Sequence, residues 1–230
     1  MFKIYVVKII KIINFIIITF LSSAAFANSE NGIWVGVFDI NGHGKYDFTG
    51  LIDNNNTTAF TEKAKVIYNG NIKFNDNSFE WNLLMYLKDG NNFGTAKITG
   101  KIIESNIMSG KWITEPAKDY GNIYLVKVNK KIMDTGEIIN KEWTSYDERK
   151  MYFFEINKNI ISGKDKNECN YYGHTKKLNK KIYELNLEIS SCGISDGTYK
   201  GMAHIKKEND INTLILNATN KNFSVFIKLQ

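Results

Sequence analysis

The two cysteines of the chain, Cys169 and Cys192, are its first candidates for chemistry, because thiols can form a disulfide, bind a metal or act as nucleophiles. A redox or nucleophilic role would favour a C-x-x-C pair or a thiolate in an electropositive pocket, and neither is suggested by the surrounding sequence. In an oxidising compartment, two cysteines that bracket a strand typically form a structural disulfide. We therefore expect Cys169 and Cys192 to be bonded to each other.

A second candidate site is the segment DINGHGKYD around Asn41. Asp39, Asn41 and Asp47 follow the spacing of a calcium loop, in which alternate oxygen atoms converge on the ion. Two ligands are missing, because His43 stands where a carboxylate is usual and Gly50 stands where a bidentate Glu is expected. The alternative is a β-hairpin in which Asn-Gly forms the turn. We expect the hairpin and no bound metal.

Motifs for catalysis are not evident in the sequence. None of the three histidines, His43, His174 and His204, has a Ser, Cys or carboxylate at motif spacing. We expect His43 in a turn, His174 in an exposed loop and His204 at an outward-facing position. Folding could still bring together two of the 24 acidic residues, which is all that a glycosidase needs. The prediction is a protein without enzymatic activity and without a cofactor.

The N-terminal segment predicts export. Three lysines precede a short apolar run, IINFIIITFL, and an Ala-Phe-Ala motif ending at Ala27 has the form of a signal-peptidase site. A retained anchor is the alternative, but the run is well short of the roughly 20 residues that a spanning helix needs. We expect cleavage after Ala27, no transmembrane segment in the mature chain, and a location in the periplasm or outside the cell.

The charge pattern argues against nucleic acid as a partner. The formal net charge of +6 falls by half when the signal peptide leaves, because that segment contains three lysines and no acidic residue. All basic residues except Arg149 are lysines, whereas phosphate and base-edge recognition usually relies on the planar fork of arginine. The expected partner is an unknown protein or a component of the cell envelope, and the sequence leaves the oligomeric state open.

Alternating apolar residues predict antiparallel strands throughout the mature chain. In FEWNLLMYL, Phe79, Trp81 and Leu83 share one face, and in YELNLEI, Tyr183 and Leu185 do the same. Similar runs recur between turn signals such as NGHG, KDGNN and DGT, and no stretch has a sustained helical period. The predicted fold class is all-β, with two tandem antiparallel β-meander or small-barrel units, possibly lipocalin-like. Closed or nearly closed units would protect the strand edges.

A degenerate internal repeat divides the chain into these two units. YNG at Tyr68 precedes FExNL as YYG at Tyr171 precedes YExNL, and farther on Ala96-x-Ile98 matches Ala203-x-Ile205. Any two amphipathic hairpins could share such a rhythm, which is the alternative explanation. The predicted boundaries are a signal peptide at 1–27, a first β unit at 28–128, a linker at 129–141, and a second β unit with the disulfide at 142–230.

The second unit resembles the C-terminal unit of uncharacterised exported proteins and lipoproteins of proteobacteria. Their pattern, of the kind G-x-D…C-x-Y-x-G…Y…C…Y-x-G-x-A, is matched here by SGKD, CNYYG, YELNLEISSC and TYKGMA. The first unit is similar in its GIWVG start and in its ITGKI, MSGKW and GNIYL segments. The resemblance implies a tandem β fold and carries over no catalytic residue. Unlike many members, this chain has no lipobox cysteine, which implies a form without a lipid anchor.

The tryptophans admit two interpretations. GIWVG is similar to the G-x-W start of lipocalin-like barrels, so Trp34, Trp81 and Trp112 could line a lumen that holds an apolar ligand. Alternatively, they fill the core, as tryptophans on the buried face of a strand do whether or not a cavity exists.

Three functions follow from these features. The first is a non-catalytic, exported cell-envelope binding protein of unknown ligand, and an exposed apolar patch would favour it. The second is an inhibitor of a periplasmic or foreign hydrolase, which would present a projecting loop such as TEPAKDYGN around Pro116. The third is a carrier of a small apolar ligand in a wide barrel lumen.

Overall fold

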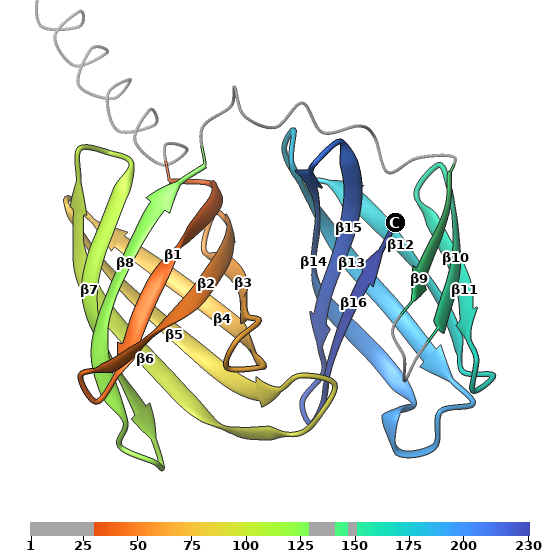
Figure 1. Cartoon of the computed structure of the whole chain (residues 1–230), viewed down its shortest axis with the longest axis horizontal. Helices are drawn as coiled ribbons and strands as arrows, with labels where there is room; N and C mark the ends of the chain where they lie inside the picture. The colour runs from red at the N-terminus through yellow and green to blue at the C-terminus, as the bar shows by residue number, and fades with distance from the viewer. Residues whose placement is uncertain (1–29, 129–140, 147–150) are drawn as a thin grey trace, which may run out of the picture.

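The computed structural model describes residues 30–128, 141–146 and 151–230. Within these ranges the chain is almost entirely antiparallel β-structure, arranged as two barrels that lie side by side (Figure 1). The one helical element of the described residues is a short 3-10 helix, Gly193–Ser195. The predicted all-β fold of two tandem units is confirmed. The predicted signal peptide and all but the last residue of the predicted linker lie outside the described residues.

The first barrel is closed, because its last strand pairs with its first. Every second side chain points inward, and the aromatic side chains of Trp34, Phe48 and Trp81 pack together in its core. Its strands are β1 (Gly32–Ile40), β2 (His43–Asp53), β3 (Asn56–Thr61), β4 (Val66–Asn75), β5 (Ser78–Leu87), β6 (Asn92–Ile103), β7 (Ile107–Glu115) and β8 (Tyr120–Lys127).

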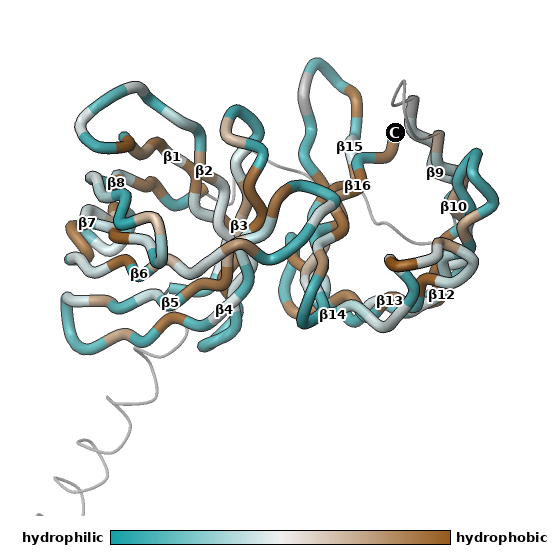
Figure 2. Tube along the Cα trace, turned by 90° about the horizontal axis from the view of Figure 1, so that it is seen from below, coloured by the Kyte–Doolittle hydropathy of each residue, from teal (hydrophilic) through white to brown (hydrophobic). Residues whose placement is uncertain are grey.

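The second unit is an eight-stranded sheet that curls round until its two edges meet (Figure 2). Thr144 in the first strand and Gln230 after the last exchange two backbone hydrogen bonds, with N···O distances of 3.0 and 2.7 Å. Its strands are β9 (Lys141–Tyr146), β10 (Met151–Asn157), β11 (Ile160–Asp165), β12 (Asn170–Lys177), β13 (Ile182–Ser190), β14 (Gly197–Glu208), β15 (Ile211–Thr219) and β16 (Ser224–Leu229).

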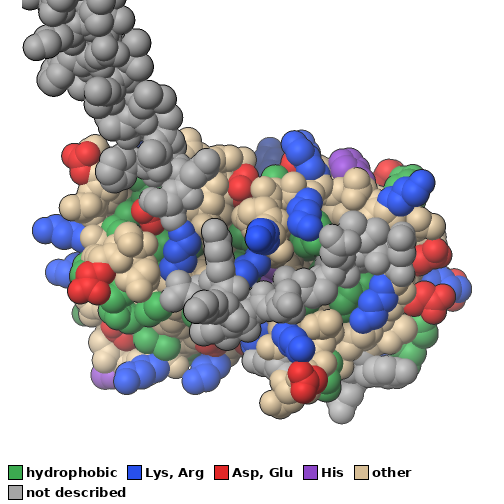
Figure 3. Space-filling model, turned by 90° about the horizontal axis from the view of Figure 1, so that it is seen from above, with side chains coloured by type: hydrophobic (Ala, Val, Ile, Leu, Met, Phe, Trp, Pro, Cys, Tyr) green, Lys and Arg blue, Asp and Glu red, His purple; other side chains and the backbone are tan. Residues whose placement is uncertain are grey.

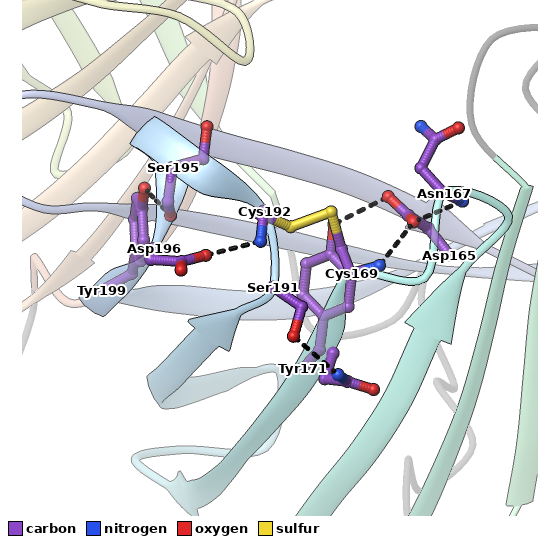
Figure 4. The surroundings of a disulfide bond; sticks show 10 residues. Asp165, Asn167, Cys169, Tyr171, Ser191, Cys192, Ser195, Asp196 and Tyr199 are labelled. Atoms are coloured by element: carbon purple, nitrogen blue, oxygen red, sulfur yellow. Dashed lines mark hydrogen bonds between the residues drawn. A yellow bond between two sulfur atoms is a disulfide. The ribbon is translucent and has the colours of Figure 1, made fainter.

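The disulfide between Cys169 and Cys192 is present, as predicted (Figure 4). The two cysteines flank the ladder of the β12–β13 hairpin, whose end pair is Asn170 with Ser190, and their Cα atoms are 5.0 Å apart. Beside them, the buried carboxylate of Asp165 accepts hydrogen bonds from the backbone N–H of Cys169 and from the Tyr171 hydroxyl. The disulfide thus closes the open end of the β12–β13 hairpin, because it joins the residue before β12 to a residue just after β13.

Strand register supports the internal repeat. Gly70 pairs with Leu83 in the first barrel, and Gly173 pairs with Leu187 in the second. A Cβ atom at Gly70 would lie 1.9 Å from the carbonyl oxygen of the facing strand, and one at Gly173 would lie 2.1 Å from it. Both positions therefore require glycine for the same reason, a close approach of two backbones.

The second half of the predicted match is out of register. Leu83 pairs with Ala96, whereas its counterpart Leu187 pairs with Tyr199, so Ala96 corresponds to Tyr199 and the match of Ala96 with Ala203 is wrong. The sequence match was wrong because apolar residues two positions apart occur on the inward face of any strand in the barrel.

The same register argument can be carried through the strands that close each barrel. Val35 pairs with Val126 in the first barrel, and Thr144 pairs with Gln230 in the second. The residues before Val35 and Thr144 are both buried tryptophans, Trp34 and Trp143. We therefore treat β1–β8 and β9–β16 as corresponding strands in the same order.

The outer faces of the two barrels pack directly against each other. Phe60, Ile67 and Tyr86 of the first barrel form one buried cluster with Ile215 and Phe226 of the second. A second buried cluster joins strands β1 and β2 to β13 and β14. Two strands of this junction, β3 and β15, are consequently buried on both faces along most of their length.

A turn of the first barrel also binds the edge of the second. In the turn between β5 and β6, the carboxylate of Asp89 accepts the backbone N–H of Phe226, at 2.9 Å, and the carbonyl of Gly90 accepts that of Ser224, also at 2.9 Å. These two bonds satisfy backbone N–H donors in the first half of strand β16. The first barrel therefore completes the hydrogen bonding of the second.

The junction leads to a prediction about the disulfide. Replacing Cys169 and Cys192 with serine should lower the free energy of unfolding by about 3 kcal/mol, because the unfolded chain loses a cross-link between residues 23 apart. Since the barrels share a buried interface, the loss should appear in both. With Trp143→Phe as the background, tryptophan fluorescence reports only the first barrel, and its denaturant midpoint should fall together with the far-UV circular dichroism signal. An unmoved fluorescence midpoint would contradict the coupling.

Candidate functional site

The residues of the calcium-loop candidate do not converge on one point. Asn41 and Gly42 have φ values of 53° and 78° and form a two-residue hairpin turn between β1 and β2. Asp47 accepts hydrogen bonds from two backbone N–H groups of the turn between β3 and β4, those of Glu62 and Lys63, at 2.7 and 2.9 Å. The pKa of Asp39 lies below its usual value, chiefly because the backbone N–H of Asn122 donates to the carboxylate. Within the described ranges, no group of three or more His, Cys, Asp or Glu side chains is placed to hold a metal.

The three histidines occupy different environments. His43 is exposed, but it lies at the first position of strand β2 and not in the turn that we expected. His174 is exposed as predicted, but it lies within strand β12 and not in a loop. His204 faces outward from the second barrel as predicted, yet it is only 2% exposed because the first barrel covers it.

The three predicted lumen tryptophans are buried in the core of the first barrel. Each indole N–H donates to a protein oxygen, at 3.0 Å for Trp34, 2.6 Å for Trp81 and 3.0 Å for Trp112. Beside Trp112 the interior leaves a cavity of only about 20 Å³, which is close to the space of one water molecule. This geometry favours the core interpretation and leaves no room there for an organic ligand.

The segment around Pro116 is the turn between β7 and β8. It begins at a cis peptide bond between Glu115 and Pro116, and Lys118 forms an ion pair with Glu115. At its other end, Asp119 accepts a hydrogen bond from the Asn41 side chain, at 2.9 Å. The turn is therefore attached to the neighbouring β1–β2 turn, and this contact gives the inhibitor hypothesis little support.

An apolar row on the outside of the first barrel is the feature that sequence reasoning missed. Ile103, Ile107, Val126 and Val35 are successive cross-strand partners on β6, β7, β8 and β1. Val35, Val126 and Ile103 are 39%, 37% and 46% exposed, and Ile107 is partly buried. We call these four residues the apolar row.

The apolar row is extended by a second exposed pair on the same face. Val37 and Tyr124 form the next cross-strand pair on the same face, 41% and 46% exposed. Figure 3 shows hydrophobic side chains on the surface of the first barrel, with Lys, Asp and Glu side chains scattered around them. Contiguous exposed apolar groups of this kind mark interaction surfaces more often than isolated ones do.

The second barrel has polar residues at the positions that correspond to the apolar row. The counterparts of Ile103, Ile107, Val126 and Val35 are, in that order, Lys206, Thr213, Gln230 and Thr144. The Gln230 amide donates to the Thr213 hydroxyl at 3.4 Å. The barrel architecture therefore does not require apolar residues at these four positions.

Two grooves border the junction of the barrels. The larger, about 800 Å³, lies over the outer face of β4–β7 and is lined by asparagines and by Leu84 and Ile113. The other, about 360 Å³, contains Asp53 and Glu184 from opposite barrels. The pKa of Asp53 is raised by partial burial and then by the negative charge of Glu184. Lys176 lines the same groove, and its positive charge acts on the Asp53 carboxyl in the opposite direction.

His204 is the buried titratable group of the junction. Its ring stacks on Phe60 of the first barrel, with 6.0 Å between centroids, and its Nδ1 atom has no hydrogen-bond partner. Burial, together with the positive charges of Lys206 and Lys228, lowers the pKa of His204 to about 3. Among the charged groups near it, Lys228 is itself paired with Glu62. His204 is therefore neutral in the folded protein at physiological pH.

Comparison with known proteins adds little to this geometry. No protein-family model matches the chain, and no curated protein matches it. A crystal structure at 2.40 Å resolution, of a Bacteroides fragilis protein whose name assigns it to the outer membrane, is 11% identical, covers 88% of this chain and 97% of its own, and has a TM-score of 0.32. So weak a likeness carries over neither fold nor function. No helix among the described residues is long and apolar enough to span a membrane.

The environment of His204 predicts a stability loss in acid. An unfolded chain protonates histidine near pH 6.5, whereas the folded protein does so only near pH 3. The free energy of unfolding is therefore unaffected above pH 6.5 and falls as the pH drops, by about 3 kcal/mol at pH 4.5. Urea unfolding across this range should show that His204→Leu removes this slope. His174→Leu, at an exposed histidine, serves as the control, and parallel profiles for wild type and His204→Leu would refute the assignment.

Proposed function

We propose that this is an exported, non-catalytic binding protein of the cell envelope, and that its partner is a protein that contacts the apolar row. The observation that carries the proposal is the difference between corresponding positions of the two barrels. Ile103, Ile107, Val126 and Val35 are apolar on an exposed face, while the second barrel folds with polar residues there. Apolar side chains that folding does not require are best explained by binding.

The shape of the apolar row favours a protein over a small molecule. Small-molecule sites are concave and enclose most of their ligand. The apolar row instead crosses four neighbouring strands on the outside of a barrel, a span of roughly 15 Å. A surface of this width matches the central apolar part of a modest protein interface, which is surrounded by polar and charged groups.

Export rests on the N-terminal segment and on the disulfide. The disulfide between Cys169 and Cys192 suits a compartment outside the cytoplasm. The resemblance of the second unit to exported proteins and lipoproteins of proteobacteria supports the same location. Fractionation of the producing cell will show whether the protein resides in the periplasm or in the medium, so it belongs in the test.

The test exchanges the apolar row for its own counterpart. The variant Val35→Thr, Ile103→Lys, Ile107→Thr and Val126→Gln copies the second barrel at each position. It should fold, because these residues already occupy the same places in a barrel. Binding of the partner should weaken by about tenfold or more, because buried apolar contacts at an interface centre carry most of its affinity.

The measurement is affinity capture from periplasm and medium with quantitative mass spectrometry, together with a photo-crosslinking residue at position 107. The control is Ile194→Thr, which removes an exposed apolar side chain, 82% exposed, on the other barrel. The proposal is supported by a protein that crosslinks at position 107 of the otherwise unchanged chain. Affinity capture should lose the same protein with the row variant and keep it with the control. Crosslinks only to a second copy of the chain, or to lipid, would overturn it.

A further inference from the structure

A cavity of about 460 Å³ lies where the first barrel meets the edge of the second. The first barrel contributes Glu62 and Lys88 to its wall, and the second contributes Lys206, Phe226 and Lys228. Its volume lies within the range of small-molecule sites. It is separate from the apolar row, which belongs to the first barrel alone.

The cavity has an excess of positive charge. Among the described lining residues, three have lysine side chains and one, Glu62, has an acidic side chain. The Lys228 ammonium lies 2.5 Å from a Glu62 carboxylate oxygen. Lys88 and Lys228 approach the same aromatic ring, with their Nζ atoms 5.2 and 5.8 Å from the centroid of Phe226. An anion bound in the cavity would be attracted by these ammonium groups.

Neutral donors complete the wall. Ser145, Thr213 and Gln230 line the cavity with the lysines, and their side chains carry hydroxyl and amide groups. Ammonium, hydroxyl and amide groups can all donate hydrogen bonds to an oxyanion, and bonds from charged donors are the stronger ones. Lysine supplies a compact charge without the fixed fork of arginine, so several oxyanion groups on one molecule suit it better than one planar group.

The corresponding surface of the first barrel lacks this charge. By register, Lys206 corresponds to Ile103, and Lys228 corresponds to Tyr124. The third lysine, Lys88, reaches the cavity only because the β5–β6 turn crosses from the first barrel. The lysine cluster is therefore specific to the junction and is not a general property of the barrel.

From this geometry we propose that the cavity binds a small soluble anion that carries two or more phosphate or carboxylate groups. Such a ligand contacts Lys88 of one barrel and Lys206 and Lys228 of the other. Because it binds only the native arrangement, it stabilises the junction and raises the melting temperature of the whole protein.

The test is titration calorimetry of the mature protein with two probes, inorganic pyrophosphate and citrate, and with acetate as the monovalent comparison. At least one multivalent probe should bind more tightly than acetate, and its affinity should fall as salt is added. Lys88→Met and Lys206→Met should each weaken it by about tenfold, the worth of one charged hydrogen bond. Methionine keeps the apolar stem, so packing around Phe226 is preserved.

Two further variants test whether the affinity rises, and whether it stays constant, where the proposal says that it should. Glu62→Gln removes the competing carboxylate from Lys228 and should strengthen binding of the same probe, again by several-fold. Lys180→Met, at an exposed lysine in the turn before β13, should leave the affinity unchanged. The proposal is overturned if neither multivalent probe binds more tightly than acetate, if Lys180→Met weakens binding as much as Lys206→Met, or if Glu62→Gln weakens it.

Discussion

The structure depends on contact between the outer faces of two β-barrels. A barrel normally presents polar side chains outward, but here Phe60 and Ile67 on one barrel and Ile215 and Phe226 on the other need each other for burial. Their burial removes apolar surface from water, and the β5–β6 turn adds backbone hydrogen bonds to the edge strand β16. The junction therefore holds together the two units, whose contact the sequence alone leaves open.

Alternation predicted the strands that are buried on one face and failed where a strand is buried on both. FEWNLLMYL and YELNLEI alternate because one face meets the core and the other meets water, and they lie in β5 and β13. NTTAFT does not alternate, because strand β3 is buried between its own core and the second barrel. The disulfide was predictable because only two cysteines exist. The burial of His204 was not, since it depends on a contact with Phe60 that is far away in sequence.

Of the two proposed sites, only the apolar row left a signal in the sequence. IWVGVF and IYLV are apolar on both alternating sets of positions, which marks them as strands with an apolar outer face. The cavity left no comparable signal, because Lys88, Lys206 and Lys228 come from three distant segments. A comparison of corresponding positions in the two barrels is more informative about binding than the apolar pattern of one strand. Where Ile103 in one barrel corresponds to Lys206 in the other, the architecture is held constant and the difference points to binding.

The two proposed sites differ in what they can do to the protein. A partner on the apolar row touches one barrel and can stabilise the other only through the junction. An anion in the cavity touches both barrels directly, beside Phe226, which is itself part of the junction cluster. The proposed anion would therefore oppose separation of the barrels, by an amount that grows with its concentration relative to Kd. If opening the junction exposes its apolar strands, the anion is the ligand that governs how often this happens, and the partner on the row is not.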